Sequence, residues 1–96
     1  MQLINKRKGK VMEKHLILGV HITDRLIHAV QIQDILTKYG HIIRTRLGLH
    51  EIASGGSPNG VLILECAGGE GDFNDLAASL KDVEGVEVQK MVFDHK

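Results

Sequence analysis

The hydrophobic period of this chain changes between two and 3.6 residues, and the order of these changes restricts the folds available to it. The segment 15–23, "HLILGVHIT", has leucine, valine or isoleucine at every second position, as a strand with one buried face does. Residues 25–39 place apolar side chains at helical spacing, and residues 73–83 repeat that spacing in a narrower stripe. The other predicted strands are 41–50, 60–68 and 86–93.

These elements follow one another in the order βαββαβ, which is typical of an α+β, ferredoxin-like sandwich. Such a fold has a four-stranded antiparallel sheet with two helices on one face. We expect the strand order 4-1-3-2, because the third strand, "GVLILECAG", is the most apolar and suits a central position. The face without helices is open, and there we expect the chemistry or the partner.

The net charge of zero hides a basic start that contains Lys6, Arg7, Lys8 and Lys10. Without these four, eight basic residues remain against twelve acidic ones, a charge of −4. A mildly acidic body lacks the basic face of a nucleic-acid-binding protein, and no apolar run reaches the roughly 20 residues of a membrane span. We expect one domain over 12–96, no direct nucleic-acid or membrane partner, and a disordered basic extension or cloning-derived residues over 1–11.

The polar side of the second predicted strand carries the first candidate site. By alternation, Arg44, Arg46, Gly48 and His50 share the open face of the sheet. The planar guanidinium of arginine binds oxyanions with two hydrogen bonds, so these residues predict a recess for a carboxylate or phosphate. The alternative is an exposed cross-strand ion pair with Glu65, which typically contributes below about 1 kcal/mol.

Histidines and a single cysteine raise the question of a metal. Cys66 shares its face with Leu62 and Leu64, which predicts a buried thiol that behaves as a small hydrophobe. His21 and His50 should face the open side, but the strand between theirs separates them by roughly 9–10 Å. We therefore expect no metal site within one chain. The alternative is a metal-responsive sensor in which His21 and His50 of different subunits share the ion.

Several enzyme and cofactor classes lack their characteristic residues. No serine or cysteine stands in a recognisable arrangement with a histidine and an acid, and the glycines at 68, 69 and 71 match neither the P-loop nor the dinucleotide fingerprint. The predicted central strands carry no aromatic residues on which RNA bases could stack. The sequence predicts no catalytic activity and no cofactor.

Three segments carry a resemblance to a known family: "MEKHLILGVHITDR" near the start, "YGHIIRTRLGLHE" in the middle and "GVEVQK" near the end. From Met12 to Lys96 the chain resembles the iron-only hydrogenase system regulators. The resemblance implies an ACT-like ferredoxin fold, a regulatory role and no DNA-binding domain. ACT-like domains pair around two-fold axes and tend to bind small effectors at the interface, so the resemblance also implies these properties.

The same topology is similar to the C-terminal domain of nickel-responsive repressors. The histidine pair of that family falls on Gly48 and His50 here, and its cysteine falls near Asn59 or Gly60. Only His50 is kept, so the similarity does not imply the nickel site.

These observations predict a non-enzymatic regulatory domain of the cytoplasm, where a single cysteine suits the reducing conditions. We expect a homodimer or homotetramer formed through the open sheet face or the edge strands, and a small anionic effector. Besides the metal sensor, a purely structural oligomerisation module is the other alternative.

Overall fold

The computed structural model describes residues 14–49 and 59–94, except for the side chains of Arg25 and Leu26. The predicted extension over 1–11 lies outside these residues. The elements are β1 (His15–Ile22), α1 (Arg25–Lys38), β2 (Ile43–Leu49), β3 (Gly60–Cys66), α2 (Glu70–Lys81) and β4 (Val86–Phe93). The predicted order βαββαβ is confirmed.

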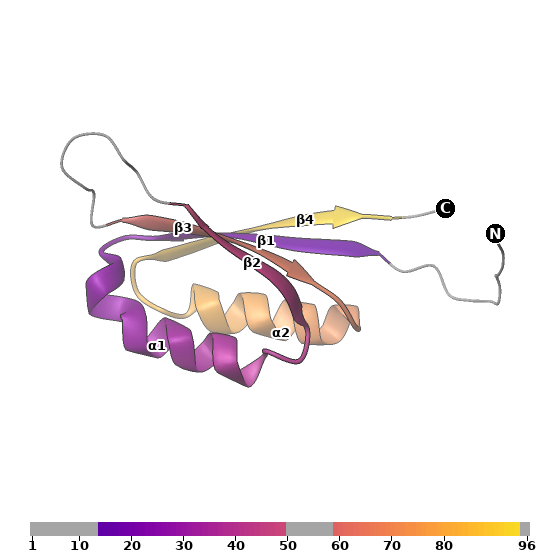
Figure 1. The fold of residues 1–96 in the computed structure, drawn as a ribbon, viewed down its shortest axis with the longest axis horizontal. Helices are drawn as coiled ribbons and strands as arrows, with labels where there is room; N and C mark the ends of the chain where they lie inside the picture. The colour runs from indigo at the N-terminus through magenta and orange to yellow at the C-terminus, as the bar shows by residue number, and fades with distance from the viewer. Residues whose placement is uncertain (1–13, 50–58, 95–96) are drawn as a thin grey trace, which may run out of the picture.

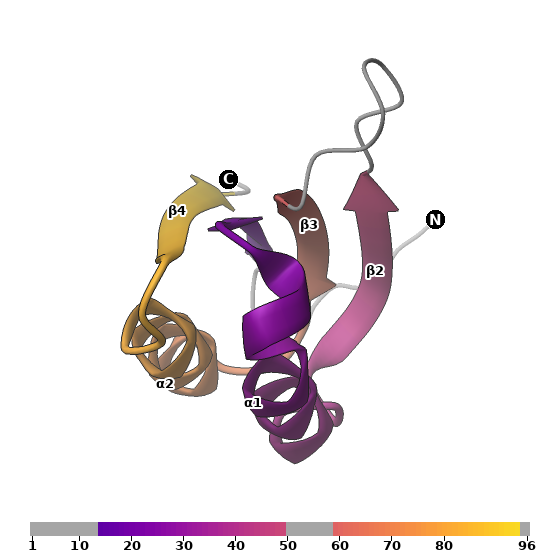
Figure 2. The same cartoon turned by 90° about the vertical axis from the view of Figure 1, so that its left-hand side faces the viewer.

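The four strands form one antiparallel sheet in the order β2-β3-β1-β4, which confirms the predicted arrangement. Both helices lie on the same face of this sheet (Figures 1 and 2). The strands β2 and β4 are the two edges, and the face opposite the helices carries no described element. The ferredoxin-like sandwich predicted from the sequence is therefore the fold observed.

The hydrophobic core lies between the sheet and the helices. Phe73 of α2 is 0% exposed, as are Leu18 of β1 and Leu64 of β3. The alternation expected for β1 holds, since every second side chain of this strand is buried. The remaining core residues are Leu16, Val20, Ile22, Ile32, Leu36, Ile42, Cys66, Leu76, Ala77, Leu80 and Val83.

The first helix begins at Arg25, as its spacing predicted, whereas the second begins at Glu70, before the predicted stripe of 73–83. Gly69 is the N-cap of α2. The N-cap of α1 is Asp24, whose backbone has a positive φ of 54°. The Asp24 N–H donates to Asn59 Oδ1 at 3.0 Å, and this bond joins the start of α1 to the residue that precedes β3.

A β-bulge in β2 changes which side of the sheet its residues face. Ile43 is paired with Cys66, but the next pair is Thr45 with Glu65, so Arg44 is the extra residue. A shift of one residue reverses the orientation of every side chain that follows. Thr45 and Leu47 therefore lie on the open face with Glu65 and Ile63, and Arg46 and Gly48 lie on the helix side.

Deletion of Arg44 tests this bulge. Without Arg44 the pairs Ile43–Cys66 and Thr45–Glu65 become neighbours in a regular ladder, so we expect the fold to survive. Deletion of Ile63 from β3 is the control, because it would turn Glu65 toward the core. Urea denaturation should give a folded protein for the first deletion and loss of cooperative unfolding for the second. An unfolded Arg44 deletion variant would contradict the bulge.

Candidate functional site

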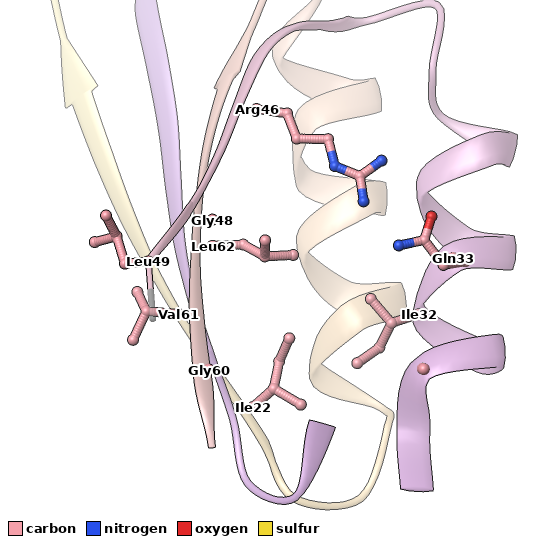
Figure 3. Close-up of a pocket in the computed structure, with 10 residues that line it drawn as sticks. Ile22, Ile32, Gln33, Arg46, Gly48, Leu49, Gly60, Val61 and Leu62 are labelled. Carbon is pink, nitrogen blue, oxygen red and sulfur yellow. The ribbon is translucent and has the colours of Figure 1, made fainter. Parts of the chain in front are cut away.

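A groove of about 190 Å³ lies on the helix side of the sheet, between α1 and the edge strand β2. Figure 3 shows the residues that line it. Ile22 of β1, Ile32 of α1 and Leu62 of β3 point into the groove and give it an apolar floor. The remaining lining residues are Ala29, Gln33, Arg46, Gly48, Leu49, Gly60 and Val61. The side chains of Leu49 and Val61 point away from the groove, toward the open face of the sheet (Figure 3).

Small residues keep the groove open. Gly48 of β2 and Gly60 of β3 place no side chain in it, and Ala29 of α1 contributes only a methyl group. A Cβ added at Gly48 would lie 3.6 Å from Leu62 Cδ2, which is ordinary van der Waals contact. Glycine at this position is therefore not required by the packing, and its effect is to leave the wall of the groove bare.

Arg46 and Gln33 form the polar rim of the groove. Their side chains point toward one another from β2 and α1 (Figure 3), and both residues are exposed. Within the described ranges 14–49 and 59–94, Arg46 forms no ion pair with an acidic side chain. A guanidinium has five N–H donors and no acceptor, so Arg46, which pairs with no described acid, can donate hydrogen bonds to an anion.

The structure divides the predicted set of Arg44, Arg46, Gly48 and His50. Arg46 and Gly48 line the groove together, but on the helix side and not on the open face. Arg44 lies at the bulge and is exposed. The expectation that these residues share the open face was wrong. It assumed regular alternation along β2, whereas the bulge at Arg44 reverses the faces of the residues that follow. His50 lies outside the described residues.

Gln33, Ala29 and Ile32 are groove residues that the sequence analysis did not identify. They come from α1, the element that directly precedes β2 in the chain, and no motif marks them. The helical spacing of residues 25–39 placed Ala29 and Ile32 within a broad apolar arc. That pattern does not reveal which strand the helix approaches.

The open sheet face is the second candidate surface. Leu47 and Leu49 of β2 are 53% and 47% exposed, and Met91 and Phe93 of β4 are 51% and 50% exposed. Cross-strand pairing places Ile63 opposite Leu47, Val61 opposite Leu49, and Ile17 opposite Met91. The acidic side chains on this face are Glu65 and Glu87, paired with Thr45 and His21 respectively. Thr45 Oγ1 donates to Glu65 Oε1 at 2.9 Å, which satisfies part of that carboxylate.

The described histidines and Cys66 are not gathered into a metal site. In the part of the chain that the structure describes, no three His, Cys, Asp or Glu residues are close enough to hold one ion. His21 is exposed and its strand neighbours on the open face are Val61 and Glu87. The inter-subunit alternative also requires His50, which lies outside the described residues.

Cys66 is a buried thiol, as its position in the pattern predicted. Burial, assisted by the charge of Glu65, raises its pKa from the ordinary value of 9.0 to about 11. Since the thiolate is the nucleophilic form, the native thiol should be unreactive near neutral pH.

The raised pKa of Cys66 predicts a pH dependence of stability. Between pH 9 and about 11 the unfolded state loses the thiol proton while the folded state keeps it. The free energy of unfolding should therefore fall by up to about 1.4 kcal/mol for each pH unit in this window. Cys66→Ala removes this contribution. The free energy of unfolding should be measured by denaturation at several pH values for the native protein and for Cys66→Ala, because the difference between the two series isolates the contribution of the thiol. Parallel pH profiles for the two proteins would contradict the shift.

Comparisons with known proteins identify the fold. The chain is similar to an uncharacterized protein from Thermotoga maritima, TM1266, with a TM-score of 0.73 and 19% identity over 83% of this chain and 96% of that one. It is also similar to CPII, a nitrogen regulatory PII-like protein from Thiomonas intermedia K12. The CPII structure with ADP, AMP and bicarbonate has a TM-score of 0.58 and 13% identity, over 86% of this chain and 93% of that one.

A second CPII structure, bound to ADP, AMP and acetate, has a TM-score of 0.55 and 12% identity over 91% of this chain and 93% of that one. Scans against protein-family models and curated proteins find no match. At these identities the likeness is one of fold.

Among the described residues, neither helix has the length and apolar character needed to cross a membrane.

Proposed function

We propose that this chain is a non-enzymatic regulatory domain that assembles with copies of itself through the open sheet face and responds to a small anionic effector. The observation that carries the proposal is the apolar character of that face, where Leu47, Leu49, Met91 and Phe93 are all about half exposed. Exposed apolar residues that gather on one surface are typical of protein interaction sites. A second copy of the chain is the occupant that needs no additional partner.

The groove supplies the effector site in this proposal. Arg46 provides a cation without a described acidic partner, beside an apolar floor. PII-like neighbours in the fold comparison are bound to small molecules, including bicarbonate and acetate, which supports a regulatory domain that responds to an effector.

Strand β2 connects the two surfaces. Leu47 and Leu49 lie on the open face, whereas the alternate residues Arg46 and Gly48 line the groove on the other side. A ligand that moves β2 on one side would therefore change the packing surface on the other. A ligand can shift an equilibrium only through its difference in affinity for two states, and here the two states are different subunit arrangements.

The biological role that we propose rests on the resemblance to the iron-only hydrogenase system regulators: the chain would be a cytoplasmic regulator of such a system. The segments "MEKHLILGVHITDR", "YGHIIRTRLGLHE" and "GVEVQK" support this assignment. The experiment is deletion of the gene in its native host, followed by measurement of hydrogenase transcripts and hydrogen production. Unchanged transcripts and unchanged hydrogen production would remove the hydrogenase link. Assembly is tested separately, by the subunit number of the purified protein.

A further inference from the structure

We propose that the groove between α1 and β2 binds a short aliphatic monocarboxylate, with its carboxylate at Arg46 and its apolar chain on the floor. This inference rests on the proposed function, because it names the chemical class of the effector. It uses the groove alone and does not depend on which residues join the subunits.

The apolar floor of the groove favours a ligand with an apolar chain. Ile22 and Ile32 are 5% and 3% exposed, so their side chains are held by the core and cannot turn away. Leu62 is half-buried and packs against the same core. A small-molecule site typically combines apolar walls with a few placed polar groups. An aliphatic chain on this floor would cover the exposed part of Leu62 and the little surface that Ile22 and Ile32 still present.

The rim selects one negative charge. Arg46 is the only charged residue among the described residues that line the groove, and Gln33 opposite it supplies a neutral amide. A guanidinium can donate two parallel hydrogen bonds to a carboxylate, and the Gln33 amide can donate to the same group. A single cation suits a monoanion, whereas a nucleotide diphosphate would bring more negative charge than Arg46 neutralises.

The described residues that line the groove favour a carboxylic acid over an amino acid. An amino acid carries an α-ammonium group beside its carboxylate, and burying this group without a partner costs free energy. The described lining residues contain no Asp or Glu that could pair with it. We therefore expect a carboxylic acid to bind more tightly than the amino acid of the same carbon skeleton.

The size of the groove agrees with a short ligand. Its volume of about 190 Å³ is below the roughly 300–1,000 Å³ of drug-sized pockets. An acid with a few apolar carbons fits within this space.

The test is isothermal titration of the full chain at pH 7 with three probes: 4-methylpentanoate, its amide, and leucine. The three share an apolar skeleton, but only the first has a carboxylate without an ammonium group. We expect 4-methylpentanoate to bind, and the amide and leucine to bind at least roughly tenfold more weakly, because hydrogen bonds to a charged group are strong. Equal affinity for acid and amide, or no heat with millimolar acid, would overturn the proposal.

Two pairs of variants locate the binding. Arg46→Gln should lower the affinity for 4-methylpentanoate roughly tenfold or more. Arg44 is the neighbouring arginine outside the groove, so Arg44→Gln should leave this affinity unchanged. Ala29→Leu should block the groove while keeping a good helix former in α1, whereas Val30→Leu on the exposed side should not. Circular dichroism checks that each variant is folded. An unchanged affinity in folded Arg46→Gln, or in folded Ala29→Leu, would refute the assigned site.

Failure of this inference can be told from failure of the proposed function. Subunit number is measured on the protein without ligand. A stable oligomer that does not bind 4-methylpentanoate would therefore refute the ligand class and leave self-assembly standing. A monomer that binds the acid at Arg46 would refute self-assembly and keep the groove.

Discussion

Replacing Phe73 by alanine should lower the free energy of unfolding by about 3–5 kcal/mol, the range measured for fully buried aromatic residues. Phe73 is 0% exposed and lies in α2, in the same core cluster as Leu18 and Leu64. The substitution removes the apolar area of the ring and leaves a cavity that close-packed neighbours fill only in part. Since domains of this kind are stable by about 5–15 kcal/mol, this is a large share of the total.

Phe93→Ala is the matched control for this prediction. The substitution is chemically identical, but Phe93 is 50% exposed on β4. The decrease in the free energy of unfolding, measured by urea denaturation, should therefore be much smaller for Phe93→Ala. Both variants should be measured at one protein concentration, because self-assembly would contribute to apparent stability. Equal losses for the two variants would contradict the position of the core between the sheet and α2.

Leu47→Glu should weaken self-assembly by about a hundredfold. Leu47 lies on the open face opposite Ile63, in the apolar part of that surface. A carboxylate buried there without a partner costs about 3 kcal/mol, which corresponds to roughly a hundredfold in the dissociation constant. Sedimentation velocity over a concentration series measures the effect directly.

Val30→Glu provides the control for Leu47→Glu. Val30 is 76% exposed on α1, on the helix side of the molecule. The new charge is the same and the starting residue is also apolar and exposed. Self-assembly should be unaffected by this variant. If Val30→Glu dissociated the oligomer and Leu47→Glu did not, the interface would lie on the helices instead of the open face.

The fold was predictable because its determinants are local periods. The alternation of residues 15–23 and the narrow stripe of 73–83 each report one buried face. The apolar third strand then placed β3 at the centre of the sheet, where it is observed. Cys66 was assigned to the core by the same argument, and it is buried there.

The candidate site was only partly predictable, and the bulge at Arg44 explains why. A run of alternating residues does not reveal an inserted residue. One insertion in a strand moves every later side chain of that strand to the opposite face of the sheet. Arg46 and Gly48 were therefore correctly grouped with each other and assigned to the wrong side of the sheet. The groove also depends on Gln33 of α1, whose position beside β2 results from tertiary packing that no local period encodes.

The most direct test of the central claim is native mass spectrometry of the untreated protein, with elemental analysis of the same sample. The proposal predicts a dimer or tetramer without stoichiometric metal. A monomer at all concentrations would contradict self-assembly through the open face. A stoichiometric metal that is lost on His50→Ala would contradict the effector-responsive domain and favour a sensor with histidine ligands from different subunits.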